Sequence, residues 1–259
     1  MPELVLDNVS MRFGGLKAVA DLDMKIPEGV ILSLIGPNGA GKTTVFNMVT
    51  GVYPPSSGTI TYGDLKLNGL RPHTIIAGGI ARTFQNIRLF KSMTVLENVA
   101  VGMHCRTHSG AVRALLKTRF ELREEKEITQ KAYEVLDKLD LSQHANEYAS
   151  NLPYGDQRRL EIARALATEP KLLLLDEPAA GMNPAETARL MKVILGLRDT
   201  GLTIFLVEHD MKVVMGISDL VTVLDYGMKI AEGTPQDIQN NEKVIEAYLG
   251  SEYVKAQTG

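Results

Sequence analysis

One glycine-rich stretch of the chain combines the residue types that bind phosphate. Residues 36–43 read GPNGAGKT and fit the pattern G-x-x-x-x-G-K-[ST] without a gap. An apolar run, residues 30–35, precedes the stretch, and a helical pattern follows it. Glycines let backbone N–H groups turn toward phosphate oxygens, and the start of a helix adds partial positive charge. The pattern predicts binding of nucleotide phosphates, with Lys42 at the β- and γ-phosphates and Thr43 at Mg²⁺.

A pair of acids lies where a second apolar run ends. Residues 172–177 read LLLLDE. Phosphoryl transfer depends mostly on positioning and charge stabilisation, so it needs a carboxylate near Mg²⁺ and a group that activates water. Asp176 suits the first task and Glu177 suits the second. The alternative, that both are ordinary surface carboxylates, is disfavoured by the presence of the glycine loop.

Two further polar residues are candidates for the same site. Gln85 lies 43 residues after Lys42, and His209 follows the third apolar run, residues 203–208. A lone histidine is more often structural, but this one follows a strand as the acid pair does, which favours a site role. The absence of an N-K-x-D motif argues against a GTPase.

The elements that would position these residues fall into two kinds. The three apolar runs are typical of strands covered on both faces, as in a parallel sheet, with helical patterns between them. Other segments alternate polar and apolar residues or are rich in β-formers, which predicts half-buried antiparallel strands. These segments are residues 4–9, 21–26 and 59–62.

The middle of the chain is charged and helical. An apolar stripe at helical spacing runs through residues 111–140. It comprises Ile128, Ala132, Val135, Leu136 and Leu139. Residues 157–168 predict another helix, with Leu160, Ala163 and Ala167 on one face. The mixed charge run at residues 119–127 is either a solvated helix face or a surface for a partner.

The end of the chain predicts two short helices. Thr234 suits an N-cap with Pro235 at the first helical position, and residues 241–250 predict a last helix that ends at Gly250.

Composition limits the remaining possibilities. The chain has 259 residues, a formal net charge of −3 and a pI near 6.0, so one large domain is expected and a nucleic-acid partner is not. A single cysteine, Cys105, excludes an internal disulfide and fits a reducing compartment. We expect neither a signal peptide nor a membrane span.

Together these motifs resemble the ATP-binding cassette (ABC) ATPases over nearly the whole chain. The resemblance implies an α/β fold, the P-loop NTPase fold of ABC ATPases, with an antiparallel β subdomain and an inserted helical subdomain. It implies one domain over residues 1–259. The core would comprise residues 1–88 and 165–235, the helical subdomain residues 90–160, and a C-terminal helical extension residues 236–259.

The resemblance also assigns roles to individual residues, with ATP and Mg²⁺ as cofactors. Glu177, His209 and Gln85 would be catalytic, and Thr43, Gln85 and Asp176 would hold the metal. Phe13 would stack on adenine. The remaining nucleotide contacts would come from Gly36, Asn38, Gly39, Ala40, Gly41, Lys42, Thr43 and Thr44, and from Tyr154 and Gly155 of the signature loop.

Two motifs depart from the family pattern. The signature L-S-G-G-Q is replaced by LPYGD at residues 152–156, so that Pro153 lacks the hydroxyl and the N–H of the expected serine. Asp156 replaces a neutral amide, and Asn183 stands for the aspartate of an L-D-P motif. In the family, the signature loop of one subunit completes the ATP site of the other. The changes therefore concern the site that this chain completes in trans, and not the site built on Lys42 and Glu177.

The same variants are similar to the ATPase subunits of branched-chain amino-acid importers. The similar segments are PYGDQRRLEIARAL, DEPAAGMNP, VEHDMKVVMGISD and NEKVIEAYLG. This implies a second ABC ATPase subunit (or a homodimer in isolation), two transmembrane permeases and, indirectly, a substrate-binding protein. The chain would lie peripherally on the cytoplasmic face of the inner membrane. Service to another transporter, such as lipid or lipopolysaccharide export, and a nucleotide-binding module with weak hydrolysis remain alternatives.

Overall fold

The computed structural model of the protein describes residues 2–103 and 119–248. Its strands form two sheets. The smaller sheet is antiparallel, with strand order β2-β1-β4-β5. Its strands are β1 (Leu4–Phe13), β2 (Leu16–Ile26), β4 (Ser57–Tyr62) and β5 (Leu65–Lys66). The three half-buried strands predicted from the sequence are thereby confirmed.

Strands β1 and β2 are longer than their alternating patterns indicate. Their pairing contains register shifts between Leu6 and Arg12, where the alternation of buried and exposed side chains breaks. Asn8 and Asp21 adopt left-handed backbone conformations, with φ angles of 47° and 46°. Bulges of this kind add unpaired residues to a strand, so a strict two-residue period underestimates its length.

The larger sheet has six strands in the order β10-β9-β3-β8-β7-β6. Its strands are β3 (Ile31–Ile35), β6 (Ile80–Arg82), β7 (Leu172–Asp176), β8 (Thr203–Val207), β9 (Leu220–Asp225) and β10 (Met228–Gly233). All neighbours are parallel except β9 and β10. The three apolar runs form the adjacent strands β3, β8 and β7, in which every residue is buried. The parallel arrangement predicted for them is confirmed.

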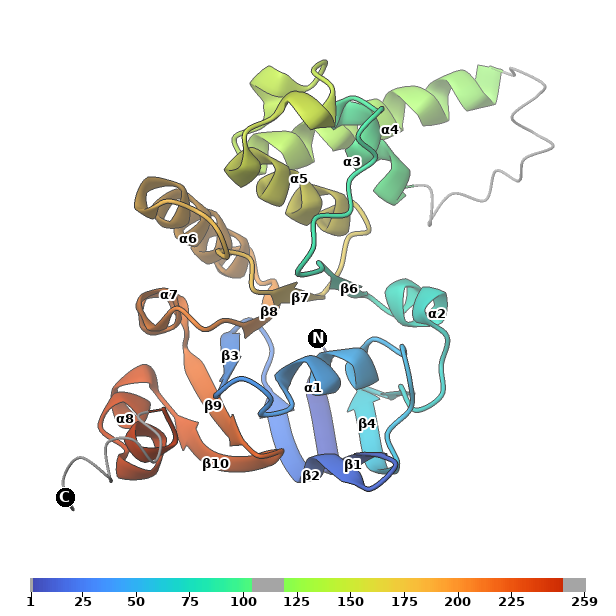
Figure 1. Ribbon diagram of the computed structural model, residues 1–259. Helices are drawn as coiled ribbons and strands as arrows, with labels where there is room; N and C mark the ends of the chain where they lie inside the picture. Colours follow the sequence, from blue (N-terminus) through green and yellow to red (C-terminus); the bar gives the residue numbers. More distant parts are fainter. Residues whose placement is uncertain (1, 104–118, 249–259) are drawn as a thin grey trace.

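Helices cover both faces of this sheet. Helix α1 (Lys42–Val49) lies between the two sheets, and its Phe46 packs in one core with residues of β1, β2, β3 and β8. Helices α6 (Pro184–Asp199) and α7 (Met211–Ile217) pack against the opposite face through Ile194 and Ile217. The short helices α2 (Pro72–Ala77) and α8 (Pro235–Gln239) lie at the two edges (Figure 1).

A group of helices lies beyond the edge strand β6, at the end of the molecule opposite the antiparallel sheet (Figure 1). Its members are α3 (Val95–Met103), α4 (Arg119–Lys138), α5 (Tyr154–Leu166) and the short 3-10 helices η2 (Ser142–His144) and η3 (Ala149–Asn151). The predicted stripe on α4 faces α3 and α5, with Ala132, Leu136 and Leu139 fully buried. Residues 125–127 of the charge run are exposed.

At the C-terminal end, Thr234 caps α8 in a capping box with Asp237, as predicted. Residues 242–248 are helical. Cys105, the predicted helix over residues 111–118 and the helix stop at Gly250 lie outside the described residues. Within the part of the chain that the structure describes, no helix is both long enough and apolar enough to cross a bilayer.

Candidate functional site

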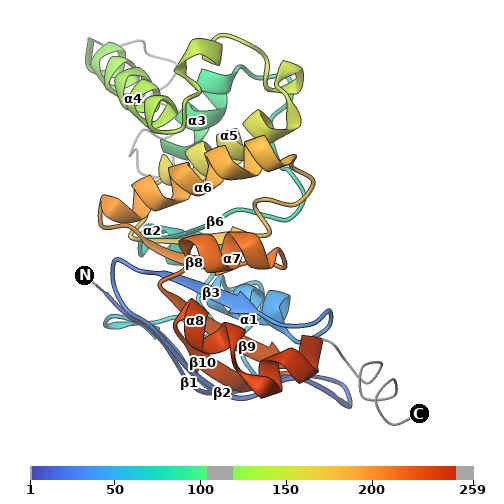
Figure 2. The ribbon, with the colours of Figure 1, turned by 90° about the vertical axis from the view of Figure 1, so that its left-hand side faces the viewer.

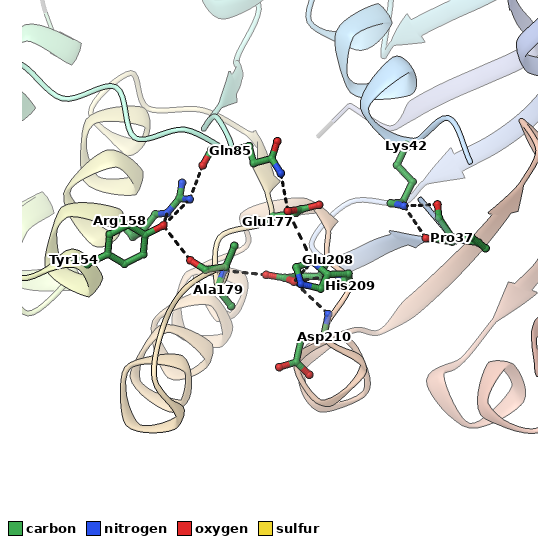
Figure 3. Close-up of polar contacts among 12 residues, drawn as sticks. Pro37, Lys42, Gln85, Tyr154, Arg158, Glu177, Ala179, Glu208, His209 and Asp210 are labelled. Atoms are coloured by element: carbon green, nitrogen blue, oxygen red, sulfur yellow. Dashed lines mark hydrogen bonds and ion pairs between the residues drawn. The ribbon is translucent and has the colours of Figure 1, made fainter. Parts of the chain in front are cut away.

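The glycine loop joins the carboxyl end of β3 to α1 and encloses the Lys42 ammonium. Gly36 and Gly41 have φ angles of 148° and 102°, which favour glycine. A Cβ atom at Gly36 would lie 2.0 Å from the carbonyl oxygen of Leu224. Lys42 Nζ donates to the carbonyl oxygens of Gly36 and Pro37 at 2.6 and 2.9 Å (Figure 3). The loop thus curls around the cation that is expected to meet phosphate.

The environment of Lys42 is buried but faces acids. Burial lowers the pKa of the Lys42 ammonium, while the negative charges of Glu177 and Asp176 act in the opposite direction. Thr43, Asn38 and Gly39 are exposed, Thr44 is half-buried and Ala40 is buried. The exposed members of the predicted set can therefore be reached by a ligand.

Asp176 and Glu177 follow β7, as predicted, but they have different surroundings. Asp176 is buried, and its Oδ2 accepts a hydrogen bond from Arg82 at 2.8 Å. Arg82 also donates to Asn47 on α1 and to Thr50, the C-cap residue of that helix. Glu177 turns out of the strand with a left-handed φ of 48°, and its N–H still bonds Val207 on β8. Asp176 is therefore fixed in an ion pair, whereas Glu177 lies just beyond the carboxyl end of β7.

Two predicted catalytic side chains converge on Glu177. Gln85 Nε2 donates to Glu177 Oε2 at 2.9 Å, and His209 Nδ1 lies 3.7 Å from the same oxygen. His209 is 59% exposed and Glu177 is 22% exposed at the side chain, so this group opens to solvent. Figure 3 shows Lys42 facing this group from the start of α1. Parallel strands place their carboxyl ends at one edge of a sheet, which explains how residues distant in sequence meet here.

Glu208 is a buried residue of the site that the sequence analysis missed. It is 1% exposed, and its Oε1 accepts the N–H of Ala179 at 2.9 Å. Its Oε2 accepts the N–H of His209 at 3.0 Å. Burial raises the pKa of the Glu208 carboxyl, and these N–H groups oppose the shift. Glu208 thereby ties the loop after β7 to the loop that carries His209.

Arg158 is a second missed residue, and it links the predicted signature loop to Gln85. Its guanidinium donates to the carbonyl oxygens of Phe84, at 3.0 Å, and Gln85, and to the Tyr154 hydroxyl. The Tyr154 hydroxyl in turn donates to Ala180 at 3.0 Å (Figure 3). The start of α5, the Gln85 segment and the loop after β7 therefore form one hydrogen-bonded unit.

The remaining predicted residues have other neighbours. Phe13 ends β1 with 46% of its surface exposed and contacts Tyr53 edge-on, with ring centroids 5.4 Å apart. Gly155 packs so closely on Glu186 that a Cβ atom would lie 2.9 Å from its carboxylate. Neither of these two contacts involves a residue of the phosphate loop.

The two departures from the family motifs have local partners. Asp156 pairs with Arg159 at 2.5 Å on the same helix, so its charge is directed back along α5. Asn183 caps α6 in a capping box with Glu186. Both polar groups are thus satisfied within this chain.

A metal at this site would need ligands besides protein acids. Within the described residues, no group of three or more His, Cys, Asp or Glu side chains is arranged to hold a metal. Thr43, Gln85 and Asp176 offer a hydroxyl, an amide and a carboxylate oxygen, which suit Mg²⁺. Such a partial set fits an ion that takes its other ligands from phosphate and water.

The fold and the site define a nucleotide-binding ATPase cassette, and comparison with known families agrees. The family model described as "ABC transporter" matches residues 19–180. The chain belongs to the ABC transporter family. A second family model, described as "Branched-chain amino acid ATP-binding cassette transporter", matches residues 228–254.

Comparison with individual proteins shows which members of the family this chain is similar to. The chain is 52% identical to the high-affinity branched-chain amino acid transport ATP-binding protein LivG of Salmonella typhimurium, over 96% of this chain and 98% of the relative. It is 32% identical to the lipopolysaccharide export system ATP-binding protein LptB of Escherichia coli, over 98% and 99%. The ADP conformation of MJ1267, a cassette of an ABC transporter, superposes with a TM-score of 0.84 at 32% identity, over 96% and 99% of the two chains.

Proposed function

We propose that this chain is the ATP-hydrolysing subunit of an importer for branched-chain amino acids. The contact of both Gln85 and His209 with Glu177 Oε2 carries the catalytic part of this proposal. Carboxylates that orient and deprotonate water act best when neighbouring side chains fix their rotamer. Glu177 would take the proton of the attacking water, and His209 would contact the γ-phosphate.

The other predicted residues would bind and orient the nucleotide. Lys42 would exchange its two carbonyl contacts for oxygens of the β- and γ-phosphates. Thr43, Gln85 and Asp176 would hold Mg²⁺, which when bound neutralises charge on the phosphate oxygens. Phe13, half exposed at the end of β1, would stack on the adenine ring.

An ATPase assay with one substitution tests this part. Glu177→Gln keeps the shape of the side chain and its contact with the Gln85 segment but removes the proton acceptor. Turnover should fall by about two to four orders of magnitude, while Mg²⁺-dependent ATP binding remains. Glu127→Gln, an exposed acid on α4, is the control and should change neither quantity. Hydrolysis by Glu177→Gln at the wild-type rate would remove Glu177 from the catalytic role.

The transport assignment rests on similarity. The higher identity to LivG than to LptB, and the match of residues 228–254 to the branched-chain model, support amino-acid import over lipopolysaccharide export. The chain would then act with a second cassette subunit and two permeases, together with a substrate-binding protein. It would lie at the cytoplasmic face of the membrane.

Affinity purification of a tagged copy from native membranes tests this assignment. Two permeases and a second, different cassette ATPase in the eluate would support the importer. A permease pair of a lipopolysaccharide exporter would favour the alternative. A chain recovered only with itself would leave the ATPase proposal in place and remove the importer.

A further inference from the structure

A cavity of about 520 Å³ lies where the end of α4, the helix η2, α5 and α6 meet. Figure 2 shows α6 crossing the front of the molecule below α4 and α5. Helix α6 forms one wall of the cavity through residues at helical spacing, which are Arg189, Lys192, Val193, Gly196 and Leu197. No residue assigned to the ATP site lines this space. The cavity is therefore a separate feature of the chain.

The cavity is basic, although the chain as a whole carries a formal net charge of −3. Four of its ten lining residues are cationic, namely Lys138, Arg159, Arg189 and Lys192. Asp140 is the one acid among the ten. Its side chain is 79% exposed and lies 4.0 Å from Arg159. A single exposed carboxylate cannot balance four cations, so the lining of this basic cavity has an excess of positive charge.

Three of the four cations are available to a ligand. Among the residues that the structure describes, the side chains of Lys138, Arg189 and Lys192 make no hydrogen bond or ion pair. All three side chains are exposed, and they come from two different helices. A cleft lined by one sign of charge focuses the electric field and concentrates ions of the opposite sign. The basic cavity is therefore suited to an anion with more than one negative charge.

Gly196 leaves space in the wall of the basic cavity. It lies within α6, where glycine costs about 0.5–1 kcal/mol relative to alanine. A Cβ atom at Gly196 would meet no heavy atom within 4 Å, so no close contact requires glycine there. Any larger side chain at this position would instead occupy space beside the cations.

Arg159 connects the basic cavity to the signature loop. Its side chain is 8% exposed, and its guanidinium donates to the Leu139 carbonyl oxygen at 2.6 Å and to Asp156 at 2.5 Å. Arg159 also lines a second cavity of about 270 Å³, together with Pro153, Gly155 and Asp156 of the signature loop. An anion in the basic cavity would therefore compete with the Asp156 carboxylate for this guanidinium.

We propose that the basic cavity binds a compact phosphorylated metabolite, which it recognises through a di- or triphosphate group. The planar guanidinium of Arg189 can donate to two phosphate oxygens, and Lys138 and Lys192 add compact positive charges. The volume lies within the range of about 300–1,000 Å³ that is typical of small-ligand sites. This site goes beyond the proposed function, because it shares no residue with the residues proposed to bind ATP.

Calorimetric titration of the full chain with inorganic pyrophosphate, in the absence of Mg²⁺, tests the site. Wild type should bind one pyrophosphate at the phosphate loop and a second in the basic cavity. Lys42→Ala should remove only the first, so this background isolates the second. In it, the double variant Arg189→Gln with Lys192→Gln should bind about 10- to 100-fold more weakly, because two charged contacts are lost.

Lys66→Gln with Arg71→Gln is the matched control for the double variant. These two cations are exposed, on β5 and just before α2, and their replacement removes the same amount of charge. The control should change the affinity for pyrophosphate by less than about twofold, because exposed charges farther apart than a Debye length are largely screened.

Two further variants test the shape of the basic cavity and its link to the signature loop. Gly196→Gln places a neutral side chain in the space and should weaken binding at least about tenfold. Glutamine is a better helix former than glycine, so the melting temperature should not fall. Asp156→Asn removes the carboxylate that competes for Arg159 and should tighten binding by about two- to fivefold.

Each outcome bears on one part of the proposal. Binding at the affinity of the Lys42→Ala background, by either Gly196→Gln or the double variant, would overturn the site. An equal loss in the control would show an effect of net charge and would also overturn it. Unchanged affinity in Asp156→Asn would overturn the competition for Arg159. If Lys42→Ala still binds two pyrophosphates, the proposed function is contradicted, and the basic cavity is not.

Discussion

Replacing Arg82 by methionine should destabilise the fold strongly, although Arg82 belongs to no recognised motif. Its guanidinium pairs with Asp176 at 2.8 Å, and the two side chains are only 8% and 6% exposed. Methionine fills most of the same space but leaves the Asp176 carboxylate buried without its cation. Removing one partner of a buried ion pair costs about 3–5 kcal/mol.

The other contributions of this substitution to the free energy of unfolding nearly cancel one another. The variant also loses the hydrogen bonds to Asn47 and Thr50, at about 1 kcal/mol each. Against this, Arg82 Nε is a buried donor without a hydrogen-bond partner among the described residues, and its removal returns about 1–3 kcal/mol. The net loss stays near 3–5 kcal/mol. For a chain of this size that is a fall in melting temperature of roughly 10 °C.

Urea unfolding followed by circular dichroism measures this loss. Lys131→Met is the control, because it breaks an ion pair with Glu169 in which both side chains are more than half exposed. It should cost less than about 1 kcal/mol. The double variant Arg82→Met with Asp176→Leu should recover most of the lost stability, since an apolar pair replaces the charges. The reasoning fails if Arg82→Met matches the control, or if the double variant is no more stable than the single ones.

The remaining predictions concern other contacts of the site. Arg158→Gln should lower ATPase turnover by about tenfold in steady-state kinetics, because it frees the Gln85 segment from α5. Arg71→Gln, which changes an exposed arginine just before α2, is the control and should leave turnover unchanged. Asn183→Ala removes the cap of α6 and should cost ~1 kcal/mol in urea unfolding. Burial raises the pKa of Glu161 against the opposing charge of Arg158, so the folded state binds this proton more tightly than the unfolded state. The free energy of unfolding relative to Glu161→Gln should therefore rise as the pH falls from neutrality through the raised pKa. If the partner ATPase has an unaltered signature loop, the two ATP sites of the complete transporter should hydrolyse ATP at different rates. Lys42→Ala should then reduce turnover more than the matching change in the partner. Equal losses of turnover would contradict this difference between the sites.

Much of the site could be predicted because its residues occur in short local patterns. The glycine loop, the acids after β7 and the histidine after β8 each follow a continuous apolar run. Such runs form the central strands of a parallel sheet, and the carboxyl ends of those strands must meet at one edge. The parallel strand type therefore followed from the residues alone, whereas the strand order β3-β8-β7 is known only from the structure.

The missed residues lack such a pattern because their partners are distant in sequence. Arg82 reads as one more cation until α1 and β7 bring Asn47 and Asp176 to it. Glu208 stands beside His209 and reads as an exposed acid. Only folding brings the Ala179 N–H to its carboxylate and removes both from water. Tertiary contacts, not residue type, determine these roles.

The strand order also dictates when the chain can assemble during synthesis. The small antiparallel sheet needs only residues up to Lys66, so it can form early on the ribosome. Strand β3, which carries the phosphate loop, pairs with β8 and β9, and β8 begins only at Thr203. At about 5–20 residues per second, the nascent loop waits roughly 10–30 s for these neighbours. Until then, a five-residue strand with four apolar side chains stays unpaired, so the nascent chain depends on chaperones or on the early sheet beside it to avoid aggregation.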